Sequence, residues 1–283
     1  KTVFITGCST GIGRATAKLF QRQKWNVVAT MRSPEKETEL TKLDNVLVTR
    51  LDVNDADSIQ SSIQQGIEKF GRIDVMVNNA GYALMGAFET LNDEQIQRQF
   101  DTNVFGLMRV CRAILPHFRQ RNGGTLINVA SMAGRLPIPL MSVYNASKWA
   151  VEGFTECLTY ELSEFNVAVK IIEPGAVNTD FFGRSSDRDN TTGESAYQNY
   201  SDSQFPVLNQ TGPGGSTSED VAQVIYTAAN DDSKRLRYQI GVDAKTLLTA
   251  RKMLPDQVFL PMIGWSLKPG IFKRFGRIFY KPA

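Results

Sequence analysis

Residues 6–13 read Thr6-Gly7-Cys8-Ser9-Thr10-Gly11-Ile12-Gly13 and lie between the apolar run Thr2–Thr6 and a helical pattern over Gly11–Gln21. At such a glycine-rich turn the backbone can approach a pyrophosphate bound at the N-terminus of the helix. A connection that binds no ligand is the alternative, but the strand before the turn and the helix after it favour a nucleotide. The candidate phosphate-binding residues are Gly7, Ser9, Thr10, Gly11, Ile12 and Gly13.

Short apolar runs alternate with longer helical patterns through residues 1–245. The predicted strands are Thr2–Thr6, Asn26–Met31, Val46–Leu51, Ile73–Val77, Thr125–Ala130, Val167–Ile172 and Leu236–Ile240. The predicted helices are Gly11–Gln21, Asp55–Phe70 with Asp55 as N-cap, Asn92–Arg121, Ser142–Phe165 and Ser218–Asn230. Because the strands are almost continuously apolar, they indicate a parallel sheet covered by helices on both faces. No linker interrupts residues 1–245, so we expect one α/β domain there.

The bulk composition argues against several classes of protein. Of the 283 residues, 42% are hydrophobic and 22% are charged, which is typical of a soluble globular protein, and the net charge of +3 is too small to indicate a nucleic-acid partner. Three scattered cysteines and the single His117 argue against a disulfide framework, a zinc site and a histidine-based triad. The sequence shows neither a signal-peptide pattern nor an apolar stretch of 18 residues, so we expect a cytoplasmic protein without a membrane-spanning helix.

Further motifs follow the predicted strands. Asn78-Asn79-Ala80-Gly81 comes after the fourth strand, Ser131 after the fifth, and Pro174-Gly175 after the sixth. The carboxyl ends of parallel strands share one edge of the sheet, and ligands bind beyond that edge. We therefore expect these motifs to gather with the glycine-rich turn in one site.

A proton-transfer centre is indicated by Tyr144 and Lys148, which stand one helical turn apart, together with Ser131 upstream. A free tyrosine has a pKa near 10, and a nearby ammonium group, together with the positive charge of an oxidised nicotinamide, would favour the tyrosinate. Tyr144 would then exchange a proton with a substrate oxygen, and Ser131 would donate a hydrogen bond to the same oxygen. Alone, these residues fit an ordinary strand end and an amphipathic helix. The glycine-rich turn makes the catalytic interpretation the stronger one.

The end of the second strand bears on the choice of cofactor. Here the chain reads Thr30-Met31-Arg32, without the acidic residue that bonds the ribose hydroxyls of NAD. Arg32 suits a 2′-phosphate, so we predict NADP(H) over NAD(H), with a solvated surface arginine as the alternative. Asp52, after the third strand, fits equally well a bond to the adenine amino group and a role as a cap or surface acid.

Together these motifs resemble those of the short-chain dehydrogenase/reductase family. The matching residues are Thr6–Gly13, Asn78–Gly81, Asn103, Ser131, Tyr144, Lys148, Pro174, Gly175 and Thr179, in the family's order across residues 1–245. The resemblance implies a Rossmann-like, doubly wound parallel sheet of about seven strands. The glycine spacing is similar to that of the short, single-domain branch.

The resemblance also implies roles for individual residues. Asn103, Ser131, Tyr144 and Lys148 would form a catalytic tetrad, in which Lys148 also holds the nicotinamide ribose and Asn103 positions a water. The Pro174-Gly175 turn and Thr179 would contact the carboxamide. Further cofactor contacts are expected at Asp52, Val53, Asn79, Ala80, Gly81, Tyr144 and Val177. Some NADP-dependent members carry a basic residue in the glycine-rich turn, where this chain has Ser9 and Thr10.

Within the family, the chain looks most like the 17β-hydroxysteroid and retinol dehydrogenases. This resemblance implies hydride transfer between a nicotinamide and a hydrophobic ketone or secondary alcohol, as in a carbonyl reductase or alcohol dehydrogenase, and a homo-oligomer (dimer or tetramer). A 3-ketoacyl-carrier reductase and an NADP(H)-binding regulatory protein with little turnover are the alternatives.

Two segments stand apart from the βαβ pattern. Residues 181–217 are rich in small polar residues and are predicted to be a loop that closes over the substrate, with a merely flexible excursion as the alternative. Residues 246–283 form a basic extension with seven Lys/Arg and one acid, and residues 269–283 predict an amphipathic helix. Its apolar stripe consists of Ile271, Phe272, Phe275, Ile278 and Phe279. This helix could pack on the body, on a partner subunit, or as a peripheral contact on an anionic membrane.

Overall fold

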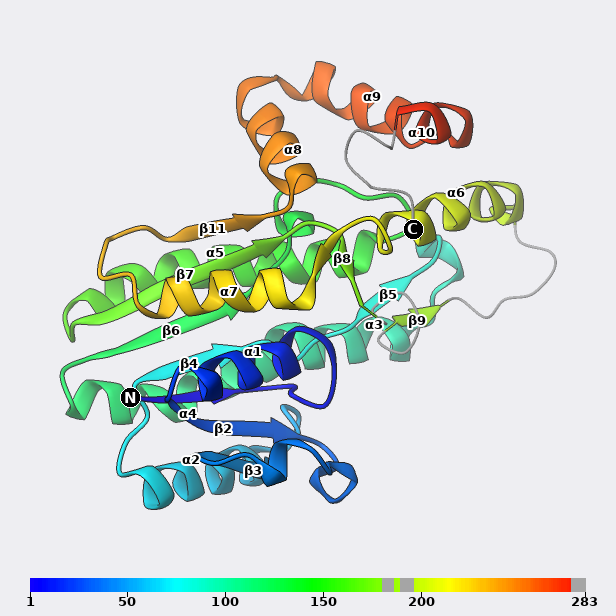
Figure 1. The fold of residues 1–283 in the computed structure, drawn as a ribbon. Helices are drawn as coiled ribbons and strands as arrows, with labels where there is room; N and C mark the ends of the chain where they lie inside the picture. Colours follow the sequence, from blue (N-terminus) through cyan, green and yellow to red (C-terminus); the bar gives the residue numbers. More distant parts are fainter. Residues whose placement is uncertain (180–185, 189–195, 276–283) are drawn as a thin grey trace.

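A computed structural model of the chain describes residues 1–179, 186–188 and 196–275. At its centre lies a seven-stranded sheet in the order β11-β7-β6-β4-β1-β2-β3, and every neighbouring pair in it is parallel. The strands are β1 (Thr2–Ile5), β2 (Asn26–Met31), β3 (Val46–Arg50), β4 (Val75–Asn78), β6 (Gly124–Val129), β7 (Val167–Pro174) and β11 (Arg237–Ile240). The sheet therefore confirms the predicted seven-stranded, Rossmann-like architecture (Figure 1).

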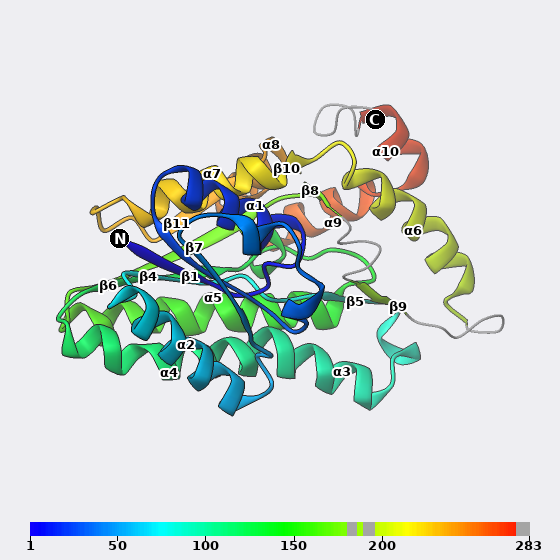
Figure 2. The same ribbon diagram turned by 60° about the horizontal axis from the view of Figure 1, so that its bottom comes forward.

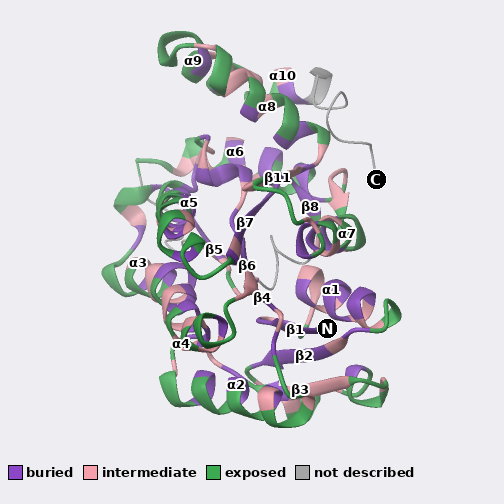
Figure 3. Cartoon of the chain, turned by 90° about the vertical axis from the view of Figure 1, so that its left-hand side faces the viewer, coloured by how far each residue is buried: buried purple, intermediate pink, exposed green. Residues whose placement is uncertain are grey.

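Helices cover both faces of this sheet, as a doubly wound fold requires. They are α1 (Gly11–Arg22), α2 (Ala56–Phe70), α3 (Asp93–Phe100), α4 (Leu107–Gln120), α5 (Ser142–Ser163) and α7 (Ser218–Ala229). The pair α1 and α7 packs on one face, and α2, α4 and α5 pack on the other (Figures 2 and 3). Short 3-10 turns occur at Pro34–Lys36, Leu40–Lys42, Phe88–Thr90 and Met132–Gly134.

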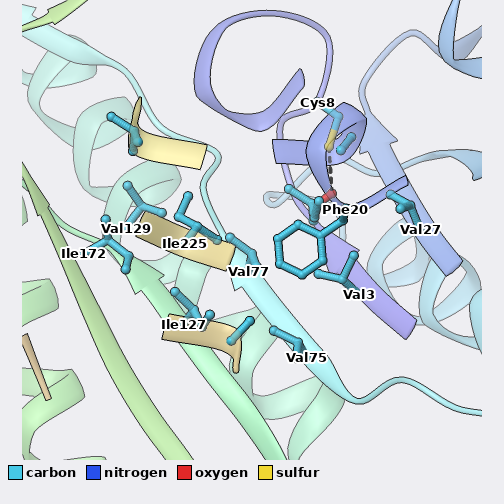
Figure 4. Packing of buried hydrophobic residues seen from close by; sticks show 14 of the residues in the cluster. Val3, Cys8, Phe20, Val27, Val75, Val77, Ile127, Val129, Ile172 and Ile225 are labelled. Atoms are coloured by element: carbon cyan, nitrogen blue, oxygen red, sulfur yellow. Dashed lines mark hydrogen bonds between the residues drawn. The ribbon is translucent and has the colours of Figure 1, made fainter. Parts of the chain in front are cut away.

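The alternation of side chains along each strand explains the apolar runs. Val3 and Ile5 of β1 face α1 and α7, where Phe20 and Ile225 close the first core (Figure 4). Phe4, between them in sequence, points into the second core on the opposite face. Burial of each such side chain contributes roughly 1.5–3 kcal/mol. Because both faces are covered, both sets of positions have to be apolar.

The predicted helix over Asn92–Arg121 is interrupted. Between α3 and α4 the chain forms a π-helical segment, Asp101–Gly106. At Gly106 an added Cβ would lie 2.7 Å from a methyl group of Val53, so the wide turn also allows a close approach to the end of β3. Single π turns inside helices are frequent at functional sites. This one carries Asn103.

The segment 181–217 is not only a loop. It contains β9 (Ser186–Arg188), α6 (Gln198–Thr211) and β10 (Ser216–Thr217), while residues 181–185 and 189–195 lie outside the described part. Strand β9 pairs with β5 (Ala83–Met85), and β10 pairs with β8 (Val177–Asn178). Helix α6 was missed because its apolar residues are few and Pro206 lies inside it, although Val207 and Leu208 are buried.

The C-terminal extension forms α8 (Val242–Met253), α9 (Asp256–Ser266) and α10 (Pro269–Phe275), above the end of the sheet in Figure 1. The predicted boundary at residue 245 falls inside α8. Phe259 and Ile263 of α9 are buried in a cluster with Met132 and Leu136, so the extension packs on the body. Of the predicted apolar stripe, Phe272 is buried, whereas Ile278 and Phe279 lie outside the described residues. Among the described helices, none combines the length and the apolar character that a membrane span requires.

Candidate active site

A cavity of about 950 Å³ opens at the carboxyl edge of the sheet. Its volume is that of a site for a large ligand. The cavity brings together nearly all the residues that the sequence nominates: Gly7, Ser9, Thr10, Gly11, Ile12, Arg32, Asp52, Val53, Asn79, Ala80, Gly81, Ser131, Tyr144, Lys148, Pro174, Gly175, Val177 and Thr179. Gly13 and Asn103 are not among the residues that line it.

The glycine-rich turn has the geometry that a phosphate cradle needs. Gly7 and Gly11 adopt φ values of 73° and 56°, in the left-handed region that favours glycine. At Gly13 a Cβ would lie 2.2 Å from the Gly7 carbonyl oxygen, so this glycine lets α1 pack against the turn. Thr10, at the N-cap of α1, makes no side-chain capping bond. The first N–H groups of α1 are therefore not capped by that side chain, which fits an anionic phosphate.

Asn79 fixes this turn from the neighbouring strand. Its side-chain amide donates to the carbonyl oxygens of Thr6 at 2.9 Å and Gly7 at 3.2 Å. The Thr6 hydroxyl in turn accepts from the N–H groups of Asn79 and Ala80, at 2.9 and 3.0 Å. These bonds join the motifs after β1 and β4 into one rigid wall.

The adenosine end of the cavity holds Arg32 and Asp52. Arg32 is exposed and forms no ion pair within the described ranges. Two of the acidic residues that follow it, Glu37 and Glu39, are already engaged, because both pair with Arg14. Asp52 accepts a hydrogen bond from the Asn54 N–H at 2.9 Å, so the acid caps a turn while it also lines the cavity.

The proton-transfer residues are almost fully buried. Tyr144 and Lys148 are 5% and 7% exposed, and the Lys148 ammonium group lies 5.8 Å from the centre of the Tyr144 ring. The Lys148 Nζ donates to the Val129 carbonyl oxygen at 2.9 Å, which anchors α5 to the end of β6. Ser131 caps the following 3-10 turn by accepting from the Ala133 N–H at 3.1 Å.

Burial, rather than mutual charge, dominates the pKa values of this pair. It raises the pKa of Tyr144 to about 12, while a hydrogen bond with Ser131 acts in the opposite direction. It also lowers the pKa of Lys148 to about 8, against the opposing effect of the Glu152 charge. In the protein without cofactor, removal from water disfavours both charged forms, so Tyr144 keeps its proton. The expectation that Lys148 and the charge of an oxidised nicotinamide together favour the tyrosinate stays a prediction.

Asn103 reaches the site through its neighbour. Its Oδ1 accepts from the Tyr82 N–H at 3.1 Å, and its Nδ2 donates to the Tyr82 carbonyl oxygen at 2.9 Å. The same Nδ2 lies 3.2 Å from the Ser147 hydroxyl oxygen, one residue before Lys148. The side chain thus connects the loop after β4 to α5, and its 2% exposure keeps it away from the cavity surface.

Two buried acids were missed by the sequence reasoning. Asp243 at the start of α8 accepts from the Ala176 N–H at 2.8 Å, and a Cβ on Gly175 would collide with its carboxylate. Asp243 therefore holds the Pro174-Gly175 turn. Glu152 lies one turn beyond Lys148 and pairs with Arg237 at 3.1 Å. A single acidic residue in a helical pattern looks the same in the sequence whether its side chain is buried and paired or exposed to solvent.

The sequence reasoning also missed much of the cavity wall beyond Tyr144. Its apolar side comes from the loop after Ser131, from α6, and from the C-terminal helices, through Leu136, Pro137, Ile138, Met141, Leu208, Leu247, Ile263 and Leu267. Polar residues, Tyr82, Arg98 and Asp187 among them, also line the cavity. No group of three or more potential metal ligands occurs in the part of the chain that the structure describes.

Comparison with known proteins identifies the family of the chain. Residues 1–190 match the family model described as short chain dehydrogenase. An uncharacterised oxidoreductase of Schizosaccharomyces pombe is 39% identical over 81% of this chain and 96% of its own length. Retinol dehydrogenase 8 of Bos taurus is 34% identical over 90% of this chain and 86% of its own length.

Solved structures show the same fold. A short-chain dehydrogenase from Streptomyces avermitilis superposes with a TM-score of 0.80 at 32% identity, covering 94% of this chain and 96% of the other. ElxO with NADP bound gives a TM-score of 0.70 at 27% identity, covering 85% and 96%. A short-chain dehydrogenase/reductase from Burkholderia phymatum in complex with NAD gives 0.77 at 25% identity, covering 89% and 93%. Similar proteins thus bind either nicotinamide cofactor.

Proposed function

The chain belongs to the short-chain dehydrogenase family and is an oxidoreductase, and we propose that it is an NADPH-dependent carbonyl reductase or alcohol dehydrogenase for hydrophobic substrates. The observation that carries this proposal is the convergence of Ser131, Tyr144 and Lys148 with the glycine-rich turn in one cavity. When bound, the nicotinamide supplies or accepts the hydride. The uncapped start of α1, the turn glycines and the Pro174-Gly175 turn are the parts of this chain that would hold it.

In the reductive direction, Tyr144 gives its hydroxyl proton to the substrate oxygen. Its pKa of about 12 keeps that proton in place at neutral pH, so the residue is ready to act as an acid. Ser131 hydrogen-bonds to the same oxygen and to Tyr144. Lys148, with a pKa of about 8, is mostly protonated at pH 7 and can return a proton to the site. Oxidation runs the same proton path backwards and gains from a higher pH.

Arg32 supports NADP(H) as the preferred cofactor. The arginine lines the cavity at the end of β2 without a carboxylate partner in the described chain, and Arg14 neutralises the nearby Glu37. A phosphate at this position gains a charge-assisted bond, whereas NAD gains nothing comparable. Because a similar protein from Burkholderia phymatum binds NAD, the proposed preference is tested by comparing NADPH with NADH.

The apolar wall supports a hydrophobic substrate. Side chains of α6, α8 and α9 close the cavity beyond Tyr144, and retinol dehydrogenase 8, a relative over most of both chains, is named for a lipophilic alcohol. We also propose a homo-oligomer, supported by the exposed aromatic side chains of Phe105 and Trp149 on neighbouring helices. Contact of residues 269–283 with an anionic membrane is a further proposal that rests on their sequence.

The experiment is a panel of steroids, retinoids, aryl ketones and diketones, offered with NADPH or NADH while nicotinamide absorbance is followed. We expect turnover of at least one hydrophobic ketone, faster with NADPH. Tight binding of NADPH with no turnover on any member would instead support the regulatory alternative. Size-exclusion chromatography with light scattering measures the oligomer directly.

A further inference from the structure

One side of the cavity is polar and is not used by the cofactor prediction or by the proton-transfer residues. It consists of Tyr82, which follows Gly81, Arg98 on α3 and Asp187 on β9. We refer to these three residues as the polar corner. They come from three separate segments, so the corner exists only in the folded chain.

The backbone of Tyr82 is held in place by two buried amides. Asn103 bonds both its N–H and its carbonyl oxygen, and Gln99 Nε2 donates to the same carbonyl oxygen at 3.0 Å. Asn103 is 2% exposed and Gln99 is fully buried. The position of the Tyr82 ring in the cavity wall is therefore set by the same residue, Asn103, that belongs to the predicted tetrad.

The Tyr82 hydroxyl is buried, and no hydrogen bond of ordinary geometry reaches it from the described residues. Burial raises the pKa of Tyr82, whereas the charge of the Arg98 guanidinium beside it and a weak side-chain hydrogen bond from that group lower it. A buried polar group without a partner costs roughly 1–3 kcal/mol, and native proteins keep few of them. Such a group can persist beside a ligand cavity, because a bound ligand can supply the missing hydrogen bond.

The polar corner carries little net charge. Arg98 pairs with Asp187 at 2.8 Å, and the amide of Gln95 approaches the other oxygen of the Asp187 carboxylate at 3.4 Å. An anionic group would meet a guanidinium that is already neutralised. A neutral hydroxyl or carbonyl oxygen, by contrast, can take the Tyr82 proton or share the Arg98 N–H groups.

We propose that the polar corner binds a second, neutral oxygen of the substrate, so that the substrate is an elongated apolar molecule with a hydroxyl or carbonyl group apart from the reacting one. The apolar side chains of Leu208, Ile263 and Met141 line the same cavity and suit the hydrocarbon part of such a molecule. This inference rests on the proposed oxidoreductase function and adds the substrate class to it.

The test compares diketones of increasing carbonyl separation with monoketones of the same chain length. With NADPH, the wild-type protein should prefer the diketone at one separation, as judged by kcat/KM. Tyr82→Phe should reduce the ratio of kcat/KM for diketone over monoketone by roughly two- to tenfold, mostly by raising the KM for the diketone. Its kcat/KM for the monoketone should stay within about twofold of wild type. Tyr160→Phe is the matched control, because Tyr160 is 80% exposed and lies far along α5.

A binding measurement separates this inference from the proposed function. Diketone and NADP+ cannot react with each other, so calorimetry on the protein loaded with NADP+ gives the same comparison without turnover. If no ketone is reduced, the proposed function fails, and the calorimetric preference alone decides on the second oxygen. Equal effects of Tyr82→Phe on diketones and monoketones, or no diketone preference in wild type at any separation, would overturn the inference.

The stability of the variant gives a further check. Tyr82→Phe removes a buried hydroxyl that lacks a hydrogen bond of ordinary geometry and leaves the backbone bonds to Asn103 and Gln99 intact, so its melting temperature should equal or exceed that of wild type. A clear fall in melting temperature would mean that the hydroxyl serves the fold, and would also overturn the inference.

Discussion

The Asn103 side chain hydrogen-bonds to both backbone groups of Tyr82: its Oδ1 accepts from the Tyr82 N–H at 3.1 Å, and its Nδ2 donates to the Tyr82 carbonyl oxygen at 2.9 Å. These two hydrogen bonds depend on the π-helical segment Asp101–Gly106, because an uninterrupted α-helix would point the Asn103 side chain in another direction. A residue nominated for catalysis thus also has a structural role. The two roles can be separated experimentally.

Asn103→Asp is expected to destabilise the protein and slow turnover together. The substitution replaces the Nδ2 donor with an oxygen that faces the Tyr82 carbonyl and the Ser147 hydroxyl. Each buried group left without a partner costs roughly 1–3 kcal/mol. Urea unfolding should show a loss of that size with an unchanged m-value. A variant with wild-type stability but low kcat would show that the structural role is minor.

Tyr144→Phe should abolish turnover and leave NADPH binding almost intact. The hydroxyl is the proposed proton donor, whereas the ring keeps its place in the buried cluster with Met141 and Leu208. Loss of a general acid typically lowers rates by ~10²–10⁴. Stopped-flow rates on a ketone, together with NADPH fluorescence titration, measure the two effects. More than about a tenth of wild-type kcat in the variant would remove Tyr144 from the central role.

Arg32→Ala should raise the KM for NADPH much more than the KM for NADH. A hydrogen bond to a charged group contributes ~1.5–3 kcal/mol, which corresponds to roughly ten- to hundredfold. Arg22→Ala, at an exposed arginine of α1 outside the cavity, is the control. If both cofactors were weakened equally, Arg32 would not read the 2′-phosphate.

Glu152 gives a prediction for stability against pH. Burial raises the pKa of its carboxyl above the ordinary value of 4.5, and the neighbouring Glu173 charge adds to this, against Arg237 and Arg135. The folded state therefore holds a proton that the unfolded state releases above about pH 4.5, so this contribution is present at low pH and is lost as pH rises through the folded pKa.

In Glu152→Gln this pH-dependent loss disappears, because the amide does not titrate. The melting temperature of the variant, relative to wild type, should rise between pH 5 and about pH 8, where the folded carboxyl titrates, and should stay level above that. Glu156→Gln is the matched control, since Glu156 bonds the same Arg237 at 3.2 Å but is largely exposed. A difference from wild type that does not change with pH would refute the proton assignment.

Local patterns were sufficient to predict the sheet and the gathering of the glycine-rich turn and the other strand-end motifs in one cavity. The runs around Val3 and Ile127 are apolar because both faces of the sheet are buried. The turn at Gly7 has a left-handed backbone conformation, which favours glycine and is therefore visible in the sequence. Helix α6 and the roles of Tyr82 and Asp243 could not be predicted in this way. They depend on which distant segments meet, such as α8 against the turn after β7.

The C-terminal helices provide the last prediction, which concerns substrate size. Ile263 on α9 is buried and lines the cavity, whereas Leu260 on the same helix is 45% exposed and does not. Ile263→Ala should therefore lower kcat/KM for a large hydrophobic ketone by about tenfold, the value of a few methylene contacts in an apolar pocket, and should affect a small ketone little. Leu260→Ala should leave kcat/KM for both substrates unchanged.

Deletion of residues 269–283 keeps every cavity residue named above, so kcat on a small ketone should stay within a few-fold of wild type. If the deletion abolished turnover of small and large ketones alike while the protein stayed folded by circular dichroism, residues 269–283 would belong to the wall of the active site rather than to a surface for assembly or membranes.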